Sequence, residues 1–171
     1  MPAGGDGLYS AAMETSHRHE RALPDEKLFH VHCDIEVRFR DLDALGHVNN
    51  AVYITYLEMA RVRYMQRLGH AELDQTPGRV FPFLLLDVYC RYHSPVVLGE
   101  KVRVFIRCSR TGRSSFEFEY LVKNPADDRL VASGYSTQVH YDYTAGRTAP
   151  LPDWLRQRVA EIEGELAEEP A

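Results

Sequence analysis

The sequence has few cysteines, and none of them lie close together. Its 171 residues contain three, Cys33, Cys90 and Cys108, and no two are separated by only two residues. Zinc sites and redox motifs of the Cys-x-x-Cys type are therefore excluded. We expect all three thiols to be reduced and to lie in the core or in strands.

Long apolar runs and an excess of positive charge are also missing. No stretch approaches the roughly 18 apolar residues of a membrane-spanning helix, and the N-terminal residues lack the apolar segment of a secretory signal. The net charge is -5 and the pI is near 5.9, which gives no reason to expect nucleic acid or an anionic membrane as the main partner. We expect a cytoplasmic protein.

Histidines are present but form no recognisable metal site. Among the eight, no pair lies four residues apart on a predicted helix with a third ligand nearby. His17 and His19 belong to a polar N-terminal stretch that we interpret as solvated. The sequence therefore predicts no bound metal.

The chain divides into three parts by composition. Residues 1–28 mix Gly, Pro, Ser and charged residues without periodicity, so we expect a flexible N-terminal segment. Residues 29–145 hold the periodic segments and suit one domain with a core of ordinary size. Residues 146–171 include PDWLRQRVAEIEGELAEE, which we expect to form a C-terminal helical tail.

Hydrophobic periodicity predicts several strands and one long helix. Residues 33–41 alternate apolar and polar side chains, as in a strand with one exposed face. Residues 51–69 carry apolar side chains at helical spacing and end at a glycine, which helix C-caps favour. Four more strands are predicted, at residues 81–93, 100–110, 114–124 and 129–143. This order predicts an α+β fold in which a curved antiparallel sheet of about five strands wraps one long central helix.

The start of the predicted helix carries an unusual group of polar residues. The sequence DLDALGHVNNAVYITYLEMAR, at residues 41–61, contains the run D-x-D-x-x-G-H-V-N-N-x-x-Y. Together with the order of elements and the sequence RYHSPVVLGEKVRV at residues 91–104, it resembles the hot-dog fold acyl-CoA thioesterases of the 4-hydroxybenzoyl-CoA thioesterase-like group. The resemblance covers about residues 30–145. It implies hydrolysis of an acyl-CoA thioester to a free acid and coenzyme A, without a separate cofactor.

The resemblance assigns the catalytic acid to Asp43. Thioester hydrolysis needs a carboxylate that attacks the carbonyl or activates water, and donors for the oxyanion. Gly46 permits a sharp turn, and His47 is placed to orient or polarise the substrate. The expected oxyanion hole is formed by backbone N–H groups at the helix start near Asn50. Acids and asparagines at such a position also serve simply as caps, and we assign Asp41 to the helix entrance and to solvent.

A second carboxylate, Glu58, is an alternative catalytic acid. It lies between Ile54 and Val62 on an apolar stripe of the predicted helix, where an unpaired charge is unfavourable. A related thioesterase group places its acid on this helix. Arg61, three residues further on, is a candidate ion-pair partner that would make Glu58 structural. The sequence leaves both interpretations open.

Two arginines are candidates for binding the substrate's nucleotide. Coenzyme A carries phosphates, which arginine binds well. The sequence RCSRTGRSS provides Arg110 and Arg113 at a predicted hairpin, and the family places basic residues near Arg113. A solvated hairpin tip is the alternative interpretation.

The resemblance also implies partners. The family joins two such sheets edge to edge, so we expect a homodimer or homotetramer that binds an acyl-CoA substrate, and neither nucleic acid nor a membrane. Asn49 and Asn50 stand where the aromatic-acyl enzyme has an aromatic pair, which favours a fatty-acyl substrate. The alternative function is a non-catalytic acyl-CoA binding or sensing module of the same fold, against which the presence of Asp43 argues.

Overall fold

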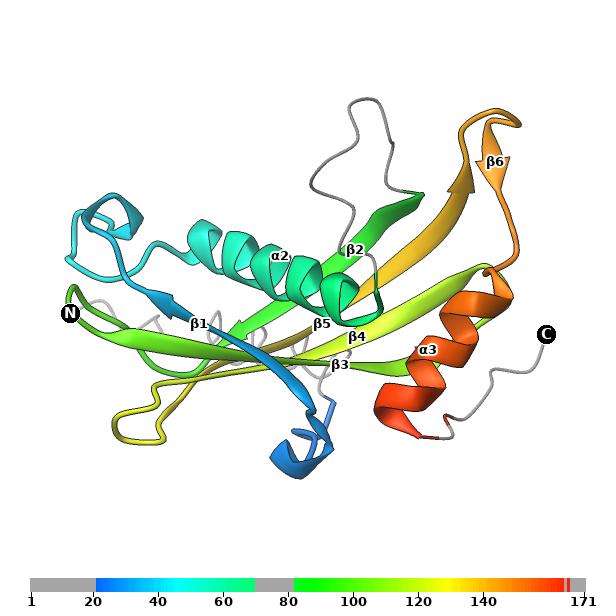
Figure 1. The fold of residues 1–171 in the computed structure, drawn as a ribbon. Coiled ribbons are helices and arrows are strands. Elements are labelled where there is room, and N and C mark those ends of the chain that lie inside the picture. Colours follow the sequence, from blue (N-terminus) through cyan, green and yellow to red (C-terminus); the bar gives the residue numbers. More distant parts are fainter. Residues whose placement is uncertain (1–20, 70–81, 165, 167–171) are drawn as a thin grey trace, which may run out of the picture.

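The structure is a curved antiparallel sheet that wraps one long helix (Figure 1). The computed structural model describes residues 21–69, 82–164 and 166. In spatial order, the main sheet consists of β1 (Val31–Glu36), β3 (Lys101–Thr111), β4 (Ser115–Lys123), β5 (Leu130–Asp142) and β2 (Phe83–Tyr92). The short β6 (Arg147–Thr148) pairs with β5. The predicted α+β architecture is therefore confirmed.

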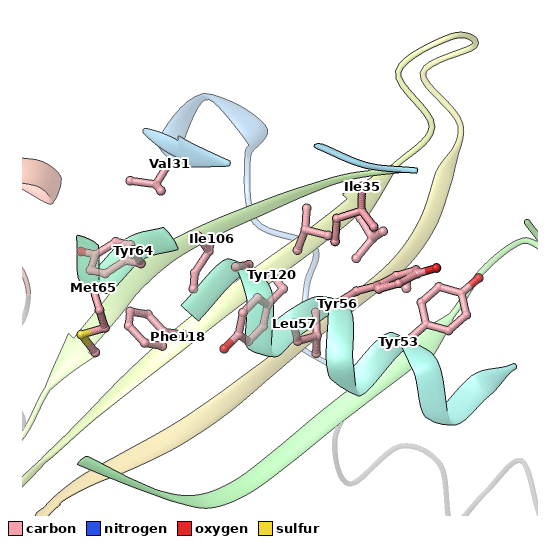
Figure 2. Packing of buried hydrophobic residues seen from close by; sticks show 14 of the residues in the cluster. Val31, Ile35, Tyr53, Tyr56, Leu57, Tyr64, Met65, Ile106, Phe118 and Tyr120 are labelled. Atoms are coloured by element: carbon pink, nitrogen blue, oxygen red, sulfur yellow. The ribbon is translucent and has the colours of Figure 1, made fainter. Parts of the chain in front are cut away.

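Helix α2 (Asn50–Arg67) crosses the concave face of the sheet and buries one apolar stripe against it. The stripe consists of Tyr53, Leu57, Ala60, Tyr64 and Leu68, all buried, as the helical spacing predicts. Figure 2 shows side chains of α2, among them those of Leu57, Tyr64 and Met65, packed among residues of the sheet such as Ile106 and Phe118. The adjacent stripe is only partly covered, because Val62 is 50% exposed. Among the described residues, no helix is long and apolar enough to cross a bilayer.

The C-terminal helix α3 (Asp153–Glu163) belongs to the same core. Its Leu155 and Val159 are buried in the cluster that α2 and the sheet form. Glu163 accepts hydrogen bonds from the Tyr64 hydroxyl at 2.7 Å and from the Cys108 N–H at 3.0 Å. The pairing of β1 with β3 ends at Ile106, so Glu163 provides an acceptor on the side of β3 that β1 no longer covers.

The described part of the expected N-terminal segment lies against the convex face of the sheet. Arg21 forms an ion pair with Glu117 of β4 at 2.5 Å, and its guanidinium lies 3.9 Å from the ring centre of Tyr135 in β5. Residues 1–20 lie outside the described residues. The flexible segment expected at residues 1–28 therefore has its last part in contact with the domain.

The first strand is shorter than predicted because the chain turns before Asp41. A 3-10 turn at Phe39–Asp41 follows β1, and the Asp41 carboxylate accepts the Arg38 N–H at 3.0 Å and two bonds from the Arg38 guanidinium, both at 3.1 Å. The Tyr56 hydroxyl of α2 donates to the same carboxylate at 2.9 Å.

The assignment of Asp41 to solvent is wrong, since the residue is 2% exposed. Burial by itself raises the pKa of the Asp41 carboxyl, but the hydrogen bonds from Arg38 and Tyr56 outweigh it and hold that pKa below its ordinary value. Asp41 therefore joins the loop before α2 to the helix itself as a buried carboxylate.

Strands β2 and β5 approach each other unusually closely at Gly134. A Cβ atom on Gly134 would lie 2.2 Å from the Tyr89 carbonyl oxygen, which is backbone and cannot move aside cheaply. Only glycine allows this approach, which bends the sheet edge around α2.

Replacing Gly134 with alanine should destabilise the protein strongly. Forcing an atom into this contact costs about 3 kcal/mol, which corresponds to a melting temperature lower by roughly 6–12 °C for a chain of this size. Calorimetry measures the change. Gly146→Ala is the matched control, because Gly146 has a φ of +65 and open space around it and should lose only about 1 kcal/mol. Equal losses in the two variants would show that the Tyr89 contact is unimportant.

Replacing Asp41 with asparagine should lower stability by about 2 kcal/mol, or roughly 4–8 °C, because the amide cannot accept all the bonds from Arg38 and Tyr56. The folded-state pKa of Asp41 is lowered, so the stabilisation is complete above the unfolded pKa of about 3.9 and is lost as pH falls through the folded value. The gap in melting temperature between wild type and variant should therefore narrow in acid.

Asp34 provides the control for this variant. Its carboxylate binds the Arg103 guanidinium at 2.6 Å and 2.7 Å but its side chain is 48% exposed. Asp34→Asn should change stability by no more than about 1 kcal/mol. A variant at Asp41 that melts no lower than the one at Asp34 would contradict the anchoring role.

Candidate active site

A tight loop between Asp43 and His47 leads into α2. The Asp43 N–H donates to the His47 carbonyl at 2.8 Å, and the Gly46 N–H donates to the Asp43 carbonyl at 3.1 Å. Gly46 has a φ of +78, the left-handed conformation that favours glycine. The sequence prediction of a glycine-dependent turn here is confirmed.

One oxygen of Asp43 is fixed by this loop and the other is not. Oδ1 accepts the Leu45 N–H at 2.8 Å and the His47 N–H at 3.3 Å. Oδ2 has no hydrogen-bond partner within residues 21–69 and 82–164. The carboxylate is therefore held in one orientation and keeps one oxygen available for chemistry.

The Asp43–His47 loop is held in place by the crossing between β2 and β3, which consists of residues 93–100. The Val48 N–H donates to the Val96 carbonyl at 2.8 Å, and His47 forms a β-bridge with Val97. The Glu100 carboxylate holds the crossing by accepting the Val97 N–H at 2.8 Å and the Arg129 guanidinium at 2.6 Å. Arg129 also donates to the carbonyl of Pro95, so strand β5 and the crossing are tied together.

A groove of ≈ 360 Å³ brings three of the predicted residues together. Asp43, His47 and Asn50 line it, together with side chains that the sequence did not assign to the site: Val48, Tyr53, Tyr92, His93, Ser94 and Pro95. The Tyr92 hydroxyl donates to the Asn50 carbonyl at 2.9 Å, and its ring lies edge-on to Tyr53 with centres 5.1 Å apart. An acid, a histidine and a helix start thus share one aromatic-walled groove.

The N-terminus of α2 favours the binding of a negatively charged group. Its first turn contains no acidic residue, and the Asn49 and Asn50 side chains both accept the Ala51 N–H, at 2.9 Å and 3.1 Å. The Asn50 N–H, in contrast, has no acceptor in the described part of the chain. Because the helix dipole is positive here, this N–H can donate to an oxyanion in the groove. The expected group of several amides is thereby reduced to one.

Three ionisable groups in or near the groove, His93, Tyr53 and Cys90, have pKa values shifted toward the neutral form. Burial, together with the charge of Arg91, lowers the pKa of His93, whose Nε2 lies 2.8 Å from the Ser133 hydroxyl. Burial raises the pKa of Tyr53 to about 12. It also raises the pKa of the Cys90 thiol to about 11, so a thiolate nucleophile is not available at this position.

Glu58 lies outside the groove. It is two helical turns beyond Asn50 and its side chain is exposed. Within the described residues it forms no ion pair, so the expected pairing with Arg61 is absent. The charge needs no partner because the stripe that carries it faces solvent in the single chain.

Arg110 and Arg113 lie at the opposite end of the sheet from Asp43. They occupy the end of β3 and the turn into β4, whereas the groove adjoins the residues before the start of β3. Ten strand residues separate the two ends, about 33 Å. Arg110 forms an ion pair with Glu117 at 3.5 Å. Within one chain, these arginines therefore do not line the groove that holds Asp43.

Metal-ligating side chains do not gather in the described residues, where no group of three His, Cys, Asp or Glu residues is arranged to hold an ion. The prediction that the protein needs no metal stays a prediction.

Comparisons with known proteins agree with this geometry. Residues 37–159 match the model of the thioesterase-like superfamily. The 1,4-dihydroxy-2-naphthoyl-CoA hydrolase of Synechococcus sp. (strain CC9605) is 31% identical over 70% of this chain and 85% of its own length. YsmA of Bacillus subtilis, an uncharacterised protein, is 29% identical over 53% of this chain, and the match spans 58% of YsmA, less than two thirds of its length.

A solved structure gives the same result. The thioesterase of Thermus thermophilus, crystallised with coenzyme A and Zn, superposes with a TM-score of 0.70 at 39% identity and covers 81% of this chain and 98% of its own. The sheet curled around one helix is the hot-dog fold, as the sequence resemblance predicted. With 123 consecutive residues, 37–159, matched to the family model, the chain belongs to the thioesterase-like superfamily.

Proposed function

We propose that the protein hydrolyses an acyl-CoA thioester to the free acid and coenzyme A, with Asp43 as nucleophile or general base. The observation that carries the proposal is the Asp43 carboxylate, which has one oxygen fixed by the Leu45 and His47 amides and the other free in the groove where α2 begins. Membership of the thioesterase-like superfamily supports thioester hydrolysis in general. The 1,4-dihydroxy-2-naphthoyl-CoA hydrolase and the Thermus structure with coenzyme A support coenzyme A as the thiol.

The reaction uses the groove as follows. The thioester carbonyl lies with its oxygen toward the Asn50 N–H, which stabilises the negative charge that develops there. The free Asp43 oxygen attacks the carbonyl carbon, or removes a proton from a water that attacks it. The carbon–sulfur bond then breaks, and the thiolate of coenzyme A takes up a proton. On the direct route, water then hydrolyses the anhydride between Asp43 and the acyl group, which frees Asp43. On either route water supplies the hydroxyl of the product acid, and no cofactor is consumed.

The remaining groove residues position the substrate. Tyr53 and Tyr92 present ring faces and edges to the acyl group beside the carbonyl. His47 contributes its backbone to the Asp43 loop and lines the groove, where its imidazole would orient the thioester. The cysteine thiols are free and at least half-buried, which agrees with the reducing, cytoplasmic location that the proposal includes.

Replacing Asp43 with asparagine should lower kcat for acyl-CoA hydrolysis by at least about 100-fold, because the amide keeps the size of the carboxylate but cannot attack or accept a proton. Release of free thiol from a panel of acyl-CoAs measures the effect. Binding of substrate should persist. An unmodified protein that binds these thioesters but releases no thiol would instead be an acyl-CoA binding module.

Glu58→Gln is the matched control, since it removes the same charge from α2 outside the groove. It should leave kcat within about threefold of wild type, as expected for an exposed charge away from the reacting atoms. The reverse result, an active Asp43→Asn and an inactive Glu58→Gln, would place the catalytic acid on the helix and contradict its assignment to Asp43.

The proposal includes assembly into a homodimer through the β2 edge. In the described chain, β2 pairs only with β5, so its other side presents free backbone N–H and C=O groups. Leu84, Leu85 and Leu86 on this edge are 37%, 45% and 65% exposed, and the nearby face of α2 exposes Met59 and Val62. Edge-to-edge pairing of two copies would cover these groups. It is also the way in which Arg110 or Arg113 of one copy can approach coenzyme A bound to another.

Light scattering should give at least the dimer mass at micromolar concentration. Leu86→Asp should shift the mass toward the monomer, because a charge at the centre of the pairing edge would be buried without a partner. Leu28, 45% exposed on the N-terminal 3-10 turn, supplies the control Leu28→Asp, which should leave the mass unchanged. A wild-type protein that is monomeric at this concentration would contradict the proposed assembly.

A further inference from the structure

A buried polar cluster lies under α2, away from the groove. The Arg61 guanidinium donates to the Tyr120 hydroxyl at 3.4 Å, and the Tyr120 and Ser136 hydroxyls are 2.6 Å apart. Gln138 Nε2 donates to the Ser136 hydroxyl oxygen at 2.8 Å. Tyr120 and Ser136 are fully buried, and Gln138 is 3% exposed. Figure 2 shows the Tyr120 ring beside Leu57 in the layer between helix and sheet.

The cluster leaves a buried polar atom unsatisfied. Gln138 Oε1 has no hydrogen-bond partner among the described residues. Turning the amide over would pair the oxygen with the Ser136 hydroxyl but would leave the NH₂ group unpaired instead. Either orientation therefore leaves one end of a 97%-buried amide without a partner, which calls for a specific explanation in a native protein.

Arg61 carries spare hydrogen-bonding capacity at the same place. A guanidinium has five N–H donors, and in the described structure Arg61 uses one of them, toward Tyr120. No carboxylate of the described residues pairs with it. The cluster thus offers a ligand several unused N–H donors of Arg61 and the unpaired end of the Gln138 amide.

The cluster faces the side of α2 that the sheet covers least. Arg63, about 200° around the helix from Arg61, lies near Cys33 of β1. The helix packs mainly on β1 and β3 and less on β2. Ser136 is paired with Val88 of β2, as Ala132 is with Tyr92 of the groove. The groove therefore adjoins one end of the β5–β2 pair, and Ser136 of the cluster lies further along the same pair.

The helix and the strand give two independent estimates of the distance between the groove and the cluster. Arg61 follows Asn50 by eleven helical residues, about 16 Å along the axis. Ser136 follows Ala132 by four strand residues, about 13 Å. An extended chain of single bonds advances about 1.2 Å per bond, so an acyl chain from the thioester carbon reaches the cluster after roughly ten to thirteen bonds.

We infer that the acyl group is a medium-length chain with a hydroxyl or carboxylate at its far end, which binds Arg61, Gln138 and the Tyr120–Ser136 pair. This inference rests on the proposed thioesterase function and names its substrate class. A terminal hydroxyl would donate to Gln138 Oε1 and accept from Arg61. A terminal carboxylate would accept from Arg61 and, with the amide turned over, from the Gln138 NH₂ group. A plain methyl end would leave the buried Gln138 amide unpaired and would give the partly buried Arg61 no acceptor. Sites built to bind a substrate oxygen reject analogues that lack it.

The test compares three thioesters of equal length: dodecanoyl-CoA, 12-hydroxydodecanoyl-CoA and the ω-carboxylate of the same chain. Thiol release should give a kcat/KM at least about tenfold higher for one or both oxygenated substrates. A preference for the hydroxyl assigns a neutral ligand, and a preference for the carboxylate assigns the charge of Arg61. Equal or faster turnover of dodecanoyl-CoA would overturn the inference while leaving the thioesterase intact.

Variants link the preference to the cluster. Tyr120→Phe, which keeps the ring, and Arg61→Met should each reduce the ratio of oxygenated to plain kcat/KM by at least about fivefold. Arg63→Met, on the other side of the helix, should leave the ratio unchanged. A ratio that survives both Tyr120→Phe and Arg61→Met would also overturn the inference.

Failure of the proposed function remains distinguishable. If no thioester is hydrolysed, calorimetric affinities for the same three compounds test the cluster alone. Tighter binding of an oxygenated chain then supports it, and equal affinities reject it.

Discussion

The buried Asp41 carboxylate is the contact on which the geometry of the site depends. It turns the chain after β1 through Arg38 and joins that turn to the middle of α2 through Tyr56, while its carbonyl accepts the Asn49 N–H at 2.8 Å. The loop of Asp43 therefore begins and ends on groups that Asp41 holds. A flexible surface loop could not keep a carboxylate oriented beside a helix N-terminus, because the ordering would have to be repeated for every substrate molecule. Asp41, the first aspartate of the motif, holds the loop in position, and Asp43, the second, keeps one oxygen free for the reaction.

The hydrophobic periodicity of the sequence was enough to predict most of the fold. Burial alternates along β3, and the apolar stripe from Tyr53 to Leu68 is buried throughout, so the predicted bounds of these two elements differ from the structure by only one or two residues. The strand predicted at residues 114–124 also lies within one residue of β4, although Glu117 and Leu121 on its other face are buried as well. The loop between Asp43 and His47 was also predictable, since a glycine followed by a histidine at a helix start resembles a known family motif. These features depend on neighbours in sequence or on a pattern that the family repeats.

Other features depend on which distant segments meet, and no local pattern encodes that. Asp41 carries the same sequence signals as a solvent-facing helix cap, although Tyr56, fifteen residues on, buries it. Tyr53 and Tyr92 read as ordinary core or strand aromatics, yet they wall the groove because α2 and the end of β2 converge there. Arg110 and Arg113 were proposed for nucleotide binding from their charge, their place at a predicted hairpin and the family resemblance, whereas the length of β3 separates them from the groove within one chain. Glu58 was treated as a buried charge because the exposed half of the α2 stripe looks apolar in sequence.

Glu163 limits the length of strand that the β1 side of the sheet presents. Beyond Ile106, where the pairing of β1 with β3 ends, the carboxylate of α3 accepts the N–H of Cys108, so this stretch of β3 is occupied by a side chain and not by a strand. The edge strand on this side therefore has six residues, against ten for β2 at the other edge. Short edge strands recruit foreign strands less readily than long ones. The C-terminal helix thus acts against unwanted sheet growth on one side of a strand-rich protein.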